Sequence, residues 1–100
     1  MSIKEGKIMI ERISKNEEKL DNILSNIKEL ELALSNFKKN KKDIALLNKY
    51  YGSKNWFKDK EDYENNKIPK IKAGVLGEDT IWNMNEDIND LIKEMKSIIL

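Results

Sequence analysis

The sequence has no cysteine and no histidine, and it contains only one proline, four glycines and seven aromatic residues. The absence of cysteine excludes a disulfide framework and thiolate chemistry, which fits a reducing cytoplasm. The absence of histidine removes the commonest general base and the commonest metal ligand. We therefore expect no catalytic residue, no metal and no cofactor, and we do not expect an enzyme.

Long apolar runs are also missing from the sequence. No stretch approaches about eighteen uninterrupted apolar residues, so the sequence predicts no membrane-spanning helix. The N-terminal residues lack the apolar segment of a signal peptide, and charged residues recur throughout the chain. We therefore expect a soluble, cytoplasmic protein.

The residues that are present are typical of a small helical protein, with 37% charged and 39% hydrophobic residues among 100. This length suffices for one domain and is too short for two good cores, so we predict a single helical domain over residues 1–100. The net charge of +1 is unevenly distributed, because residues 38–72 carry eleven lysines and five acids, whereas residues 73–100 carry two lysines and six acids. The two regions either complement each other within the molecule, or the basic region meets an anionic partner.

Apolar side chains repeat every seven residues from about residue 8 to residue 37. No proline or glycine interrupts this region, and the repeat continues over four heptads, which predicts a long helix. We call its two rows the heptad stripe. The first row (a positions) is Ile13, Leu20, Ile27 and Leu34, and the second row (d positions) is Met9, Ile23, Leu30 and Phe37.

Asn16 is the one polar residue in the second row of the heptad stripe. A polar residue at such a position either fixes the register of a paired helix or lies near a frayed, solvent-exposed helix end. Because Asn16 is close to the N-terminus, the sequence favours the second interpretation.

Four lysines follow the long helix within five residues, at Lys38, Lys39, Lys41 and Lys42. Lysines near a helix C-terminus interact favourably with the helix dipole, so a solvated turn between two helices is the simpler interpretation. Binding of an anion, such as a nucleic acid, by these four lysines is the alternative, although the run contains no arginine and no aromatic residue. Asp43 is then predicted to be the N-cap of a short helix.

Four of the seven aromatic residues lie within residues 50–57. Gly52 is predicted to end the short helix in a left-handed conformation, and Ser53 is predicted to cap the next helix. Because aromatic rings bury large areas, this segment is expected to fix the angle between the helices. The predicted structural corner consists of Tyr50, Tyr51, Gly52, Ser53 and Trp56.

The helix after the corner is predicted to run from about residue 54 to residue 65, with Trp56, Phe57 and Tyr63 as its inward positions. The hydroxyl groups of the three tyrosines can in principle transfer protons, but no histidine is available to activate them. We therefore predict that these hydroxyls bond to the backbone or to carboxylates.

The last helix is predicted to begin at Gly77, which serves as its N-cap. Glu78 and Asp79 would then lie in its first turn, where the helix dipole favours anions. A catalytic carboxylate pair is the alternative, but adjacent residues on a helix diverge. Apolar residues of this helix again repeat in heptads, at Ile81, Met84, Ile88, Leu91, Met95 and Ile98.

Helix lengths then predict the architecture. The first helix would be about 45 Å long and the last about 30 Å long. If the two pair antiparallel, some 15 Å of the heptad stripe is left for the short middle helices or for a second copy of the chain to cover. We therefore predict an all-α antiparallel bundle with a long N-terminal helix, two short middle helices and a long C-terminal helix.

The corner and the start of the last helix also resemble a family. Tyr50-Tyr51-Gly52-Ser53-x-x-Trp56, followed by Gly74-Val75-Leu76-x-Glu78-Asp79, resembles the bacterial domain-of-unknown-function family 4298 over nearly the whole chain. In that family an acidic linker often precedes the second motif, whereas the linker here is rich in lysine. The family carries no established activity. The resemblance implies that Trp56 and the tyrosines pack near Val75 and Leu76.

Three functions are consistent with these residues. A non-enzymatic interaction module, which forms a homodimer or binds another protein through the long helix, is favoured by the heptad stripe and by the missing histidine and cysteine. An accessory protein that binds nucleic acid or another anionic surface through the lysines is the second hypothesis. An enzyme that uses Tyr50, Tyr51 or the pair Glu78 and Asp79 is the third and least favoured.

Overall fold

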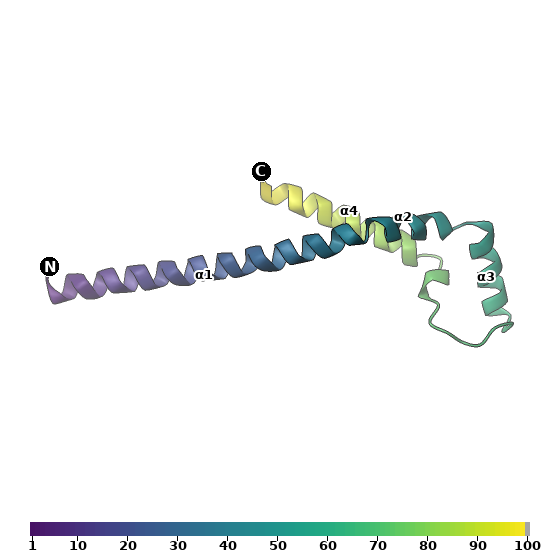
Figure 1. The fold of residues 1–100 in the computed structure, drawn as a ribbon, viewed down its shortest axis with the longest axis horizontal. Coiled ribbons are helices and arrows are strands. Elements are labelled where there is room, and N and C mark those ends of the chain that lie inside the picture. The colour runs from purple at the N-terminus through teal and green to yellow at the C-terminus, as the bar shows by residue number, and fades with distance from the viewer. Residues whose placement is uncertain (100) are drawn as a thin grey trace. The chain divides into compact units, whose positions relative to one another are not determined.

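The computed structural model describes residues 1–99, and all of its regular elements are helices. Figure 1 shows them in chain order: α1 (Ile3–Lys39), α2 (Lys41–Tyr50), α3 (Lys54–Glu64), a short 3-10 helix η1 (Gly74–Leu76) and α4 (Thr80–Ile99). No strand occurs within these residues. The predicted all-α class is confirmed, as is the order of a long first helix, two short middle helices and a long last helix.

The chain divides into two compact units, Met1–Lys41 and Lys42–Leu100. The first unit contains α1 and the first residue of α2, and the second contains the rest of α2 together with α3, η1 and α4. Two predictions depend on how the two units are arranged, namely the antiparallel bundle and the single domain over residues 1–100. Because each unit is described by itself, both stay predictions.

Helix α1 is longer than predicted at both ends. Ser2 precedes it in an extended conformation, and the Ser2 Oγ accepts a hydrogen bond from the backbone N–H of Glu5 at 3.1 Å. A serine followed three residues later by a glutamate is a helix-start signal, and it adds about one and a half turns before residue 8. At the other end, Lys38 and Lys39 extend α1 through its last turn.

Helix α2 begins at Lys41, so the predicted N-cap at Asp43 is wrong. Asn40 is the one residue between α1 and α2, and its φ of −80° and ψ of −7° keep the backbone near the right-handed helical region. The chain therefore passes from one helix to the next without the extended residue that an N-cap requires. Asp43 lies in the first turn of α2, where the helix dipole still favours its negative charge.

The segment after α3 forms hydrogen bonds with residues of that helix. Asn65 caps the C-terminus of α3, and Asn66 adopts the left-handed conformation with a φ of 59°. This conformation allows the backbone N–H of Lys67 to donate to the carbonyl of Asp62 at 2.9 Å. Further along, the Tyr63 hydroxyl donates to the carbonyl of Ile71 at 3.2 Å, so the connecting segment follows α3 back toward η1.

Helix α4 begins at Thr80, so the prediction that Gly77 caps it is wrong. The residues before it form η1 instead, and the N–H of Gly77 closes that turn by donating to the carbonyl of Gly74 at 3.0 Å. The carbonyl of Asp79 accepts the N–H of Asn83 at 2.7 Å, which makes Asp79 the residue that leads into α4. Glu78 and Asp79 therefore precede the first turn rather than occupy it.

The apolar core of the second unit is small and contains one residue from each of α3, η1 and α4. The exposed fractions are 4% for Trp56, 9% for Leu76 and 2% for Ile81. Phe57, predicted to face inward, is 60% exposed. Consecutive residues on a helix point about 100° apart, so a helix that directs Trp56 inward directs Phe57 away from the core.

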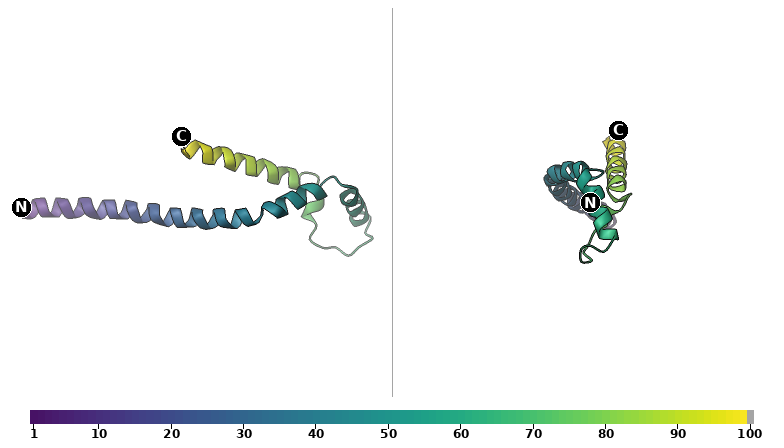
Figure 2. Two further views of the ribbon diagram at one scale, coloured as in Figure 1. Left: turned by 45° about the horizontal axis from the view of Figure 1, so that its top comes forward. Right: turned by 90° about the vertical axis from the view of Figure 1, so that its right-hand side faces the viewer.

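Helices α2 and α4 run in opposite directions within the second unit, as Figures 1 and 2 show from different sides. Two asparagines join them. The Asn85 Nδ2 donates to the Asn48 Oδ1 at 2.7 Å, and the Asn48 Nδ2 donates to the Asn85 Oδ1 at 3.3 Å. This reciprocal pair fixes which residues of the two helices lie side by side.

Candidate functional site

Backbone geometry at Gly52 and Ser53 creates the corner between α2 and α3. Gly52 has a φ of 76°, which is the left-handed conformation predicted from the sequence. The Ser53 Oγ accepts the backbone N–H of Trp56 at 3.1 Å, so the predicted N-cap of α3 is also confirmed. Together the two residues end one helix and start the next within two positions of the chain.

Trp56 connects this corner to η1. Its indole Nε1 donates to the carbonyl of Val75 at 2.9 Å, across 19 residues of sequence. The ring of Tyr51 packs against Trp56 at an interplanar angle of 81° with 5.2 Å between centroids, and Phe57 packs on it at 79° and 4.9 Å. Edge-to-face pairs of this kind contribute about 0.5–1.5 kcal/mol each beyond area burial. Trp56 therefore lies near Val75 and Leu76, as the resemblance implies.

Residues before α4 are held to the same corner. The Tyr51 hydroxyl donates to the backbone carbonyl of Glu78, and the Lys60 Nζ lies 3.0 Å from the Glu78 Oε1. The same Lys60 ammonium is 5.2 Å from the centroid of Trp56. The Glu78 side chain is 80% exposed, so we attribute little stability to its ion pair and more to the Tyr51 hydrogen bond.

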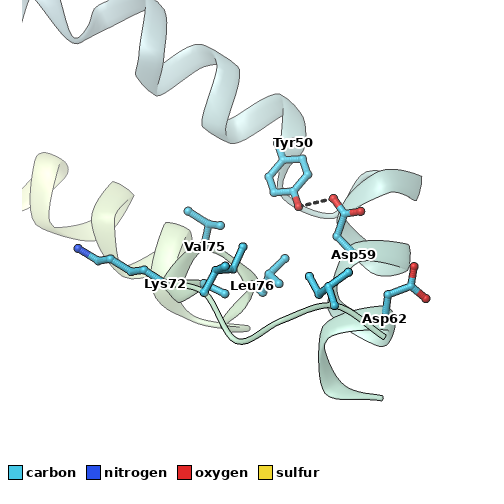
Figure 3. Close-up of a pocket in the computed structure, with 9 residues that line it drawn as sticks. Tyr50, Asp59, Asp62, Lys72, Val75 and Leu76 are labelled. Carbon is cyan, nitrogen blue, oxygen red and sulfur yellow. Dashed lines mark hydrogen bonds between the residues drawn. The ribbon is translucent and has the colours of Figure 1, made fainter. Parts of the chain in front are cut away.

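A pocket of about 220 Å³ lies between the end of α2, α3 and the segment that includes η1. Figure 3 shows Tyr50, Asp59 and Asp62 on one side and Val75 and Leu76 on the other, with the amino group of Lys72 directed away. The remaining lining residues are Ile68, Ile71 and Ala73, so most of the wall is aliphatic.

The polar group of this pocket is the pair Tyr50 and Asp59. The Tyr50 hydroxyl donates to the Asp59 Oδ2 at 2.7 Å. Burial, the hydrogen bond and the negative charge of Asp59 together raise the pKa of Tyr50 to about 12. At neutral pH the phenol is therefore protonated and acts as a hydrogen-bond donor, which makes it a poor general base.

The other carboxylate of the pocket, Asp62, forms ion pairs with two lysines. The Lys58 Nζ lies 3.0 Å from the Asp62 Oδ2, and the Lys67 Nζ lies 3.4 Å from the Asp62 Oδ1. The hydrogen bond from Lys58, more than any other contact, lowers the pKa of Asp62. Both carboxylates of the pocket are thus already bound, Asp59 by the Tyr50 hydroxyl and Asp62 by two lysines. They do not form an acid and a base directed at a common point.

Tyr50, Tyr51 and Tyr63 all use their hydroxyls as the sequence predicts, one toward a carboxylate and two toward backbone carbonyls. The sequence did not indicate that Asp59 accepts from Tyr50 or that Lys60 donates to Glu78. Sequence analysis also missed the pair Asn48 and Asn85. A signal for that pair exists, because each asparagine is four residues after an inward isoleucine, Ile44 or Ile81.

The four lysines of the predicted anion site are not among the residues that line this pocket. Lys38 and Lys39 end α1, and Lys41 and Lys42 begin α2. All four are exposed, and none of them lines the pocket. Anion binding by these lysines stays a prediction.

Described by itself, α1 presents the heptad stripe without burying any side chain. The stripe residues other than Met9 are between 38% and 56% exposed. Asn16 is also exposed, but it lies more than three turns inside a helix that begins at Ile3 with a capped end. Both interpretations of Asn16, a solvent-exposed helix end and a role in helix pairing, stay predictions.

Two features of other protein classes are missing from the part of the chain that the structure describes. Within residues 1–99, no helix combines the length and the apolar character needed to span a membrane. Over the same residues, no group of three or more acidic side chains is arranged to hold a metal ion.

Comparison with known proteins identifies a family. Neither the curated proteins nor the solved structures contain a significant match to this chain. A family described as "Domain of unknown function (DUF4298)" matches residues 13–98, which include most of α1, the corner, η1 and nearly all of α4. Because the match covers well over half of the chain, this protein belongs to the DUF4298 family.

Proposed function

We propose that this protein is a non-enzymatic interaction module whose contact surface is the heptad stripe of α1. The observation that carries the proposal is that α1 has a regular apolar repeat but no buried side chain. Two apolar rows continue through a helix of 37 residues, yet none of its side chains is buried. A regular apolar stripe of this kind is the surface that paired helices bury against each other.

The chemistry of the pocket supports a non-enzymatic role. Its Tyr50 is a hydrogen-bond donor to Asp59, and its Asp62 is paired with two lysines. These groups stabilise the fold around the corner, and they leave no nucleophile beside an available base. The role of the second unit, in this proposal, is to provide a folded end for the long helix.

Two leucines of α1 provide a matched test. Leu30 belongs to the heptad stripe, whereas Leu32 lies on the opposite face, and their exposed fractions are 55% and 64%. Leu30→Glu should abolish association, and Leu32→Glu should leave it unchanged, because only the first places a charge within the stripe. The measurement is light scattering over a concentration series, together with the helix content from circular dichroism.

The result that would contradict the proposal is a monomer with a fully formed α1 at every concentration and equal behaviour of the two variants. An isolated helix gains most of its stability from packing its apolar face. A stripe with no partner should therefore not hold 37 residues in a fully populated helix, whichever leucine is replaced.

The alternative function uses Lys38, Lys39, Lys41 and Lys42, which are all exposed. In this alternative the protein binds nucleic acid or another anionic surface. Contacts to phosphates weaken steeply as salt is added, whereas association of apolar surfaces does not. A salt titration of any complex therefore separates the two functions.

A further inference from the structure

The heptad stripe is longer than the other helices of the chain can cover. With 37 residues α1 is about 55 Å long, whereas α4, with 20 residues, is about 30 Å long. Part of α4 is already beside α2, where Asn85 bonds to Asn48. The heptad stripe itself, from Met9 to Phe37, is about 43 Å long, so at least about 13 Å of it exceeds the length of any other helix described here. A second α1 has both the same length and the same repeat.

Asn16 indicates how two such helices would be oriented. In a parallel, in-register pair, each d position faces the same d position of its neighbour, so Asn16 faces Asn16 of the second copy. A carboxamide carries both donors and acceptors, so two of them can bond reciprocally. The molecule already contains such a pair between two helices, at Asn48 and Asn85.

An antiparallel pair leaves Asn16 without a partner. In that arrangement a d position faces an a position of the neighbouring helix, and the a row from Ile13 onward is entirely aliphatic. The amide of Asn16 would then be covered by an isoleucine or leucine and lose its hydrogen bonds to water. The parallel arrangement is therefore favoured whatever register the antiparallel pair adopts over the stripe.

Charges beside the stripe agree with the parallel arrangement. In a parallel pair, each g position faces the e position five residues further along the other helix. Arg12 then faces Glu17 of the second copy, which is an attractive pair on each side of the dimer. No pair of like charges arises at the other flanking positions, which combine Glu5 with Ile10, Lys19 with Leu24, Asn26 with Glu31 and Ala33 with Lys38.

We propose that α1 pairs with α1 of a second copy of this chain as a parallel, in-register, two-stranded coiled coil, with Asn16 paired to Asn16 and Arg12 facing Glu17. This proposal rests on the proposed function and names the partner of the heptad stripe. It also explains why a helix with no buried side chain contains one regularly placed polar residue.

The chain has no cysteine, so single cysteine variants of the full chain test this arrangement directly. Met9→Cys places a thiol in the d row, and Ser25→Cys places one on the opposite face. In a thiol–disulfide redox buffer, Met9→Cys should be converted mainly to a covalent dimer, whereas Ser25→Cys should stay mainly unlinked. Light scattering under reducing conditions gives the mass of the non-covalent species.

Three outcomes are distinguishable. A dimer in which Met9→Cys links efficiently and Ser25→Cys does not supports the parallel pair. A dimer in which the two variants link equally slowly overturns the parallel arrangement but leaves the proposed function standing. A monomer at all concentrations overturns pairing with a second copy, and the helix content of that monomer then decides the proposed function separately, because a fully formed α1 without a partner contradicts it.

Exchange of charges provides an independent test. Arg12→Glu should weaken the dimer by about three- to tenfold, because it places two acids opposite each other on both sides. Adding Glu17→Arg in the same chain should restore most of the affinity. Within one helix the two residues are five positions apart and do not face each other, so failure of the restoration would overturn the parallel register.

Discussion

Helix α1 and the corner of the second unit use their apolar residues in different ways. The second unit buries Trp56, Leu76 and Ile81 almost completely, and its corner adds hydrogen bonds from Trp56 and Tyr51 to backbone carbonyls distant in sequence. In α1, seven of the stripe residues are between 38% and 56% exposed, and none is buried. The corner therefore contains its own stabilising contacts, whereas the apolar surface of α1 is the one for which we propose a second helix as partner.

This difference separates what each region needs in order to fold. The second unit has a small core, so each of its few buried groups should carry a large share of its stability. Substitutions at the corner should lower the free energy of unfolding directly. Substitutions in the heptad stripe should act through association, and their effect should depend on protein concentration.

The largest effect is expected from Trp56→Ala. Trp56 is 4% exposed and donates to the carbonyl of Val75, so truncation removes a buried ring from the small core and leaves that carbonyl without its partner. Replacing a buried tryptophan by alanine costs about 3–5 kcal/mol, which is enough to unfold much of this small unit. Urea denaturation followed by circular dichroism measures the loss.

Trp82→Ala is the matched control for that substitution, because Trp82 is 56% exposed. We expect a loss of less than about 1 kcal/mol, as for most substitutions at exposed sites. Equal losses for the two tryptophans would show that the corner is not the main source of stability in the second unit.

A smaller effect is expected from Gly52→Ala. The φ of 76° at Gly52 is unfavourable for a side chain with a Cβ, and the cost is about 1–2 kcal/mol. Gly52→Val should cost more, because a β-branched side chain is still less compatible with this conformation. Thermal unfolding measures both variants, and Gly52→Asn should retain more stability than either because asparagine tolerates the left-handed region.

Gly74→Ala is the control for backbone strain. A Cβ built at Gly74 meets no atom within 4 Å, and the same is true at Gly52, so the two positions differ in backbone conformation rather than in space. Gly74→Ala should therefore be nearly neutral. A similar loss at both glycines would argue against strain at the corner as the cause.

Signals that are local in sequence were sufficient to predict most of the helices. The heptad stripe identified α1, and the adjacent residues Gly52 and Ser53 identified the end of α2 and the start of α3 correctly. These predictions succeed because caps and apolar repeats depend on neighbours within one or two turns. Helix starts without such a signal, at Lys41 and Thr80, were misplaced.

Contacts between distant residues were not predictable in the same way. The residues that accept from Trp56 and Tyr50 are Val75 and Asp59, and nothing in the local pattern distinguishes Asp59 from the other acids of α3. The proximity of Trp56 to Val75 followed from the family resemblance alone. The pocket depends on the turn at Asn66 and on the 3-10 conformation of η1, which no periodicity indicates.

The smallest effect is expected from Tyr50→Phe, and its pH dependence distinguishes a hydrogen bond from ring packing. The substitution keeps the ring and removes the donor to Asp59, so at neutral pH it should cost less than about 1 kcal/mol at this partly exposed site. Because the pKa of Tyr50 is raised from 10.0 to about 12, the folded state holds the phenolic proton more tightly than the unfolded state does. This contribution is complete below pH 10 and is lost as the pH rises through 12.

The difference in unfolding free energy between wild type and Tyr50→Phe should therefore be constant below pH 10 and shift in favour of Tyr50→Phe as the pH rises from 10 through 12. Ultraviolet titration of tyrosinate should show a late phase near pH 12 that is absent in Tyr50→Phe. Asp59→Asn should shift that phase toward lower pH, because it removes the negative charge that opposes ionisation. If the late phase persists in Tyr50→Phe, another tyrosine carries the raised pKa, and the hydrogen bond to Asp59 is not its cause.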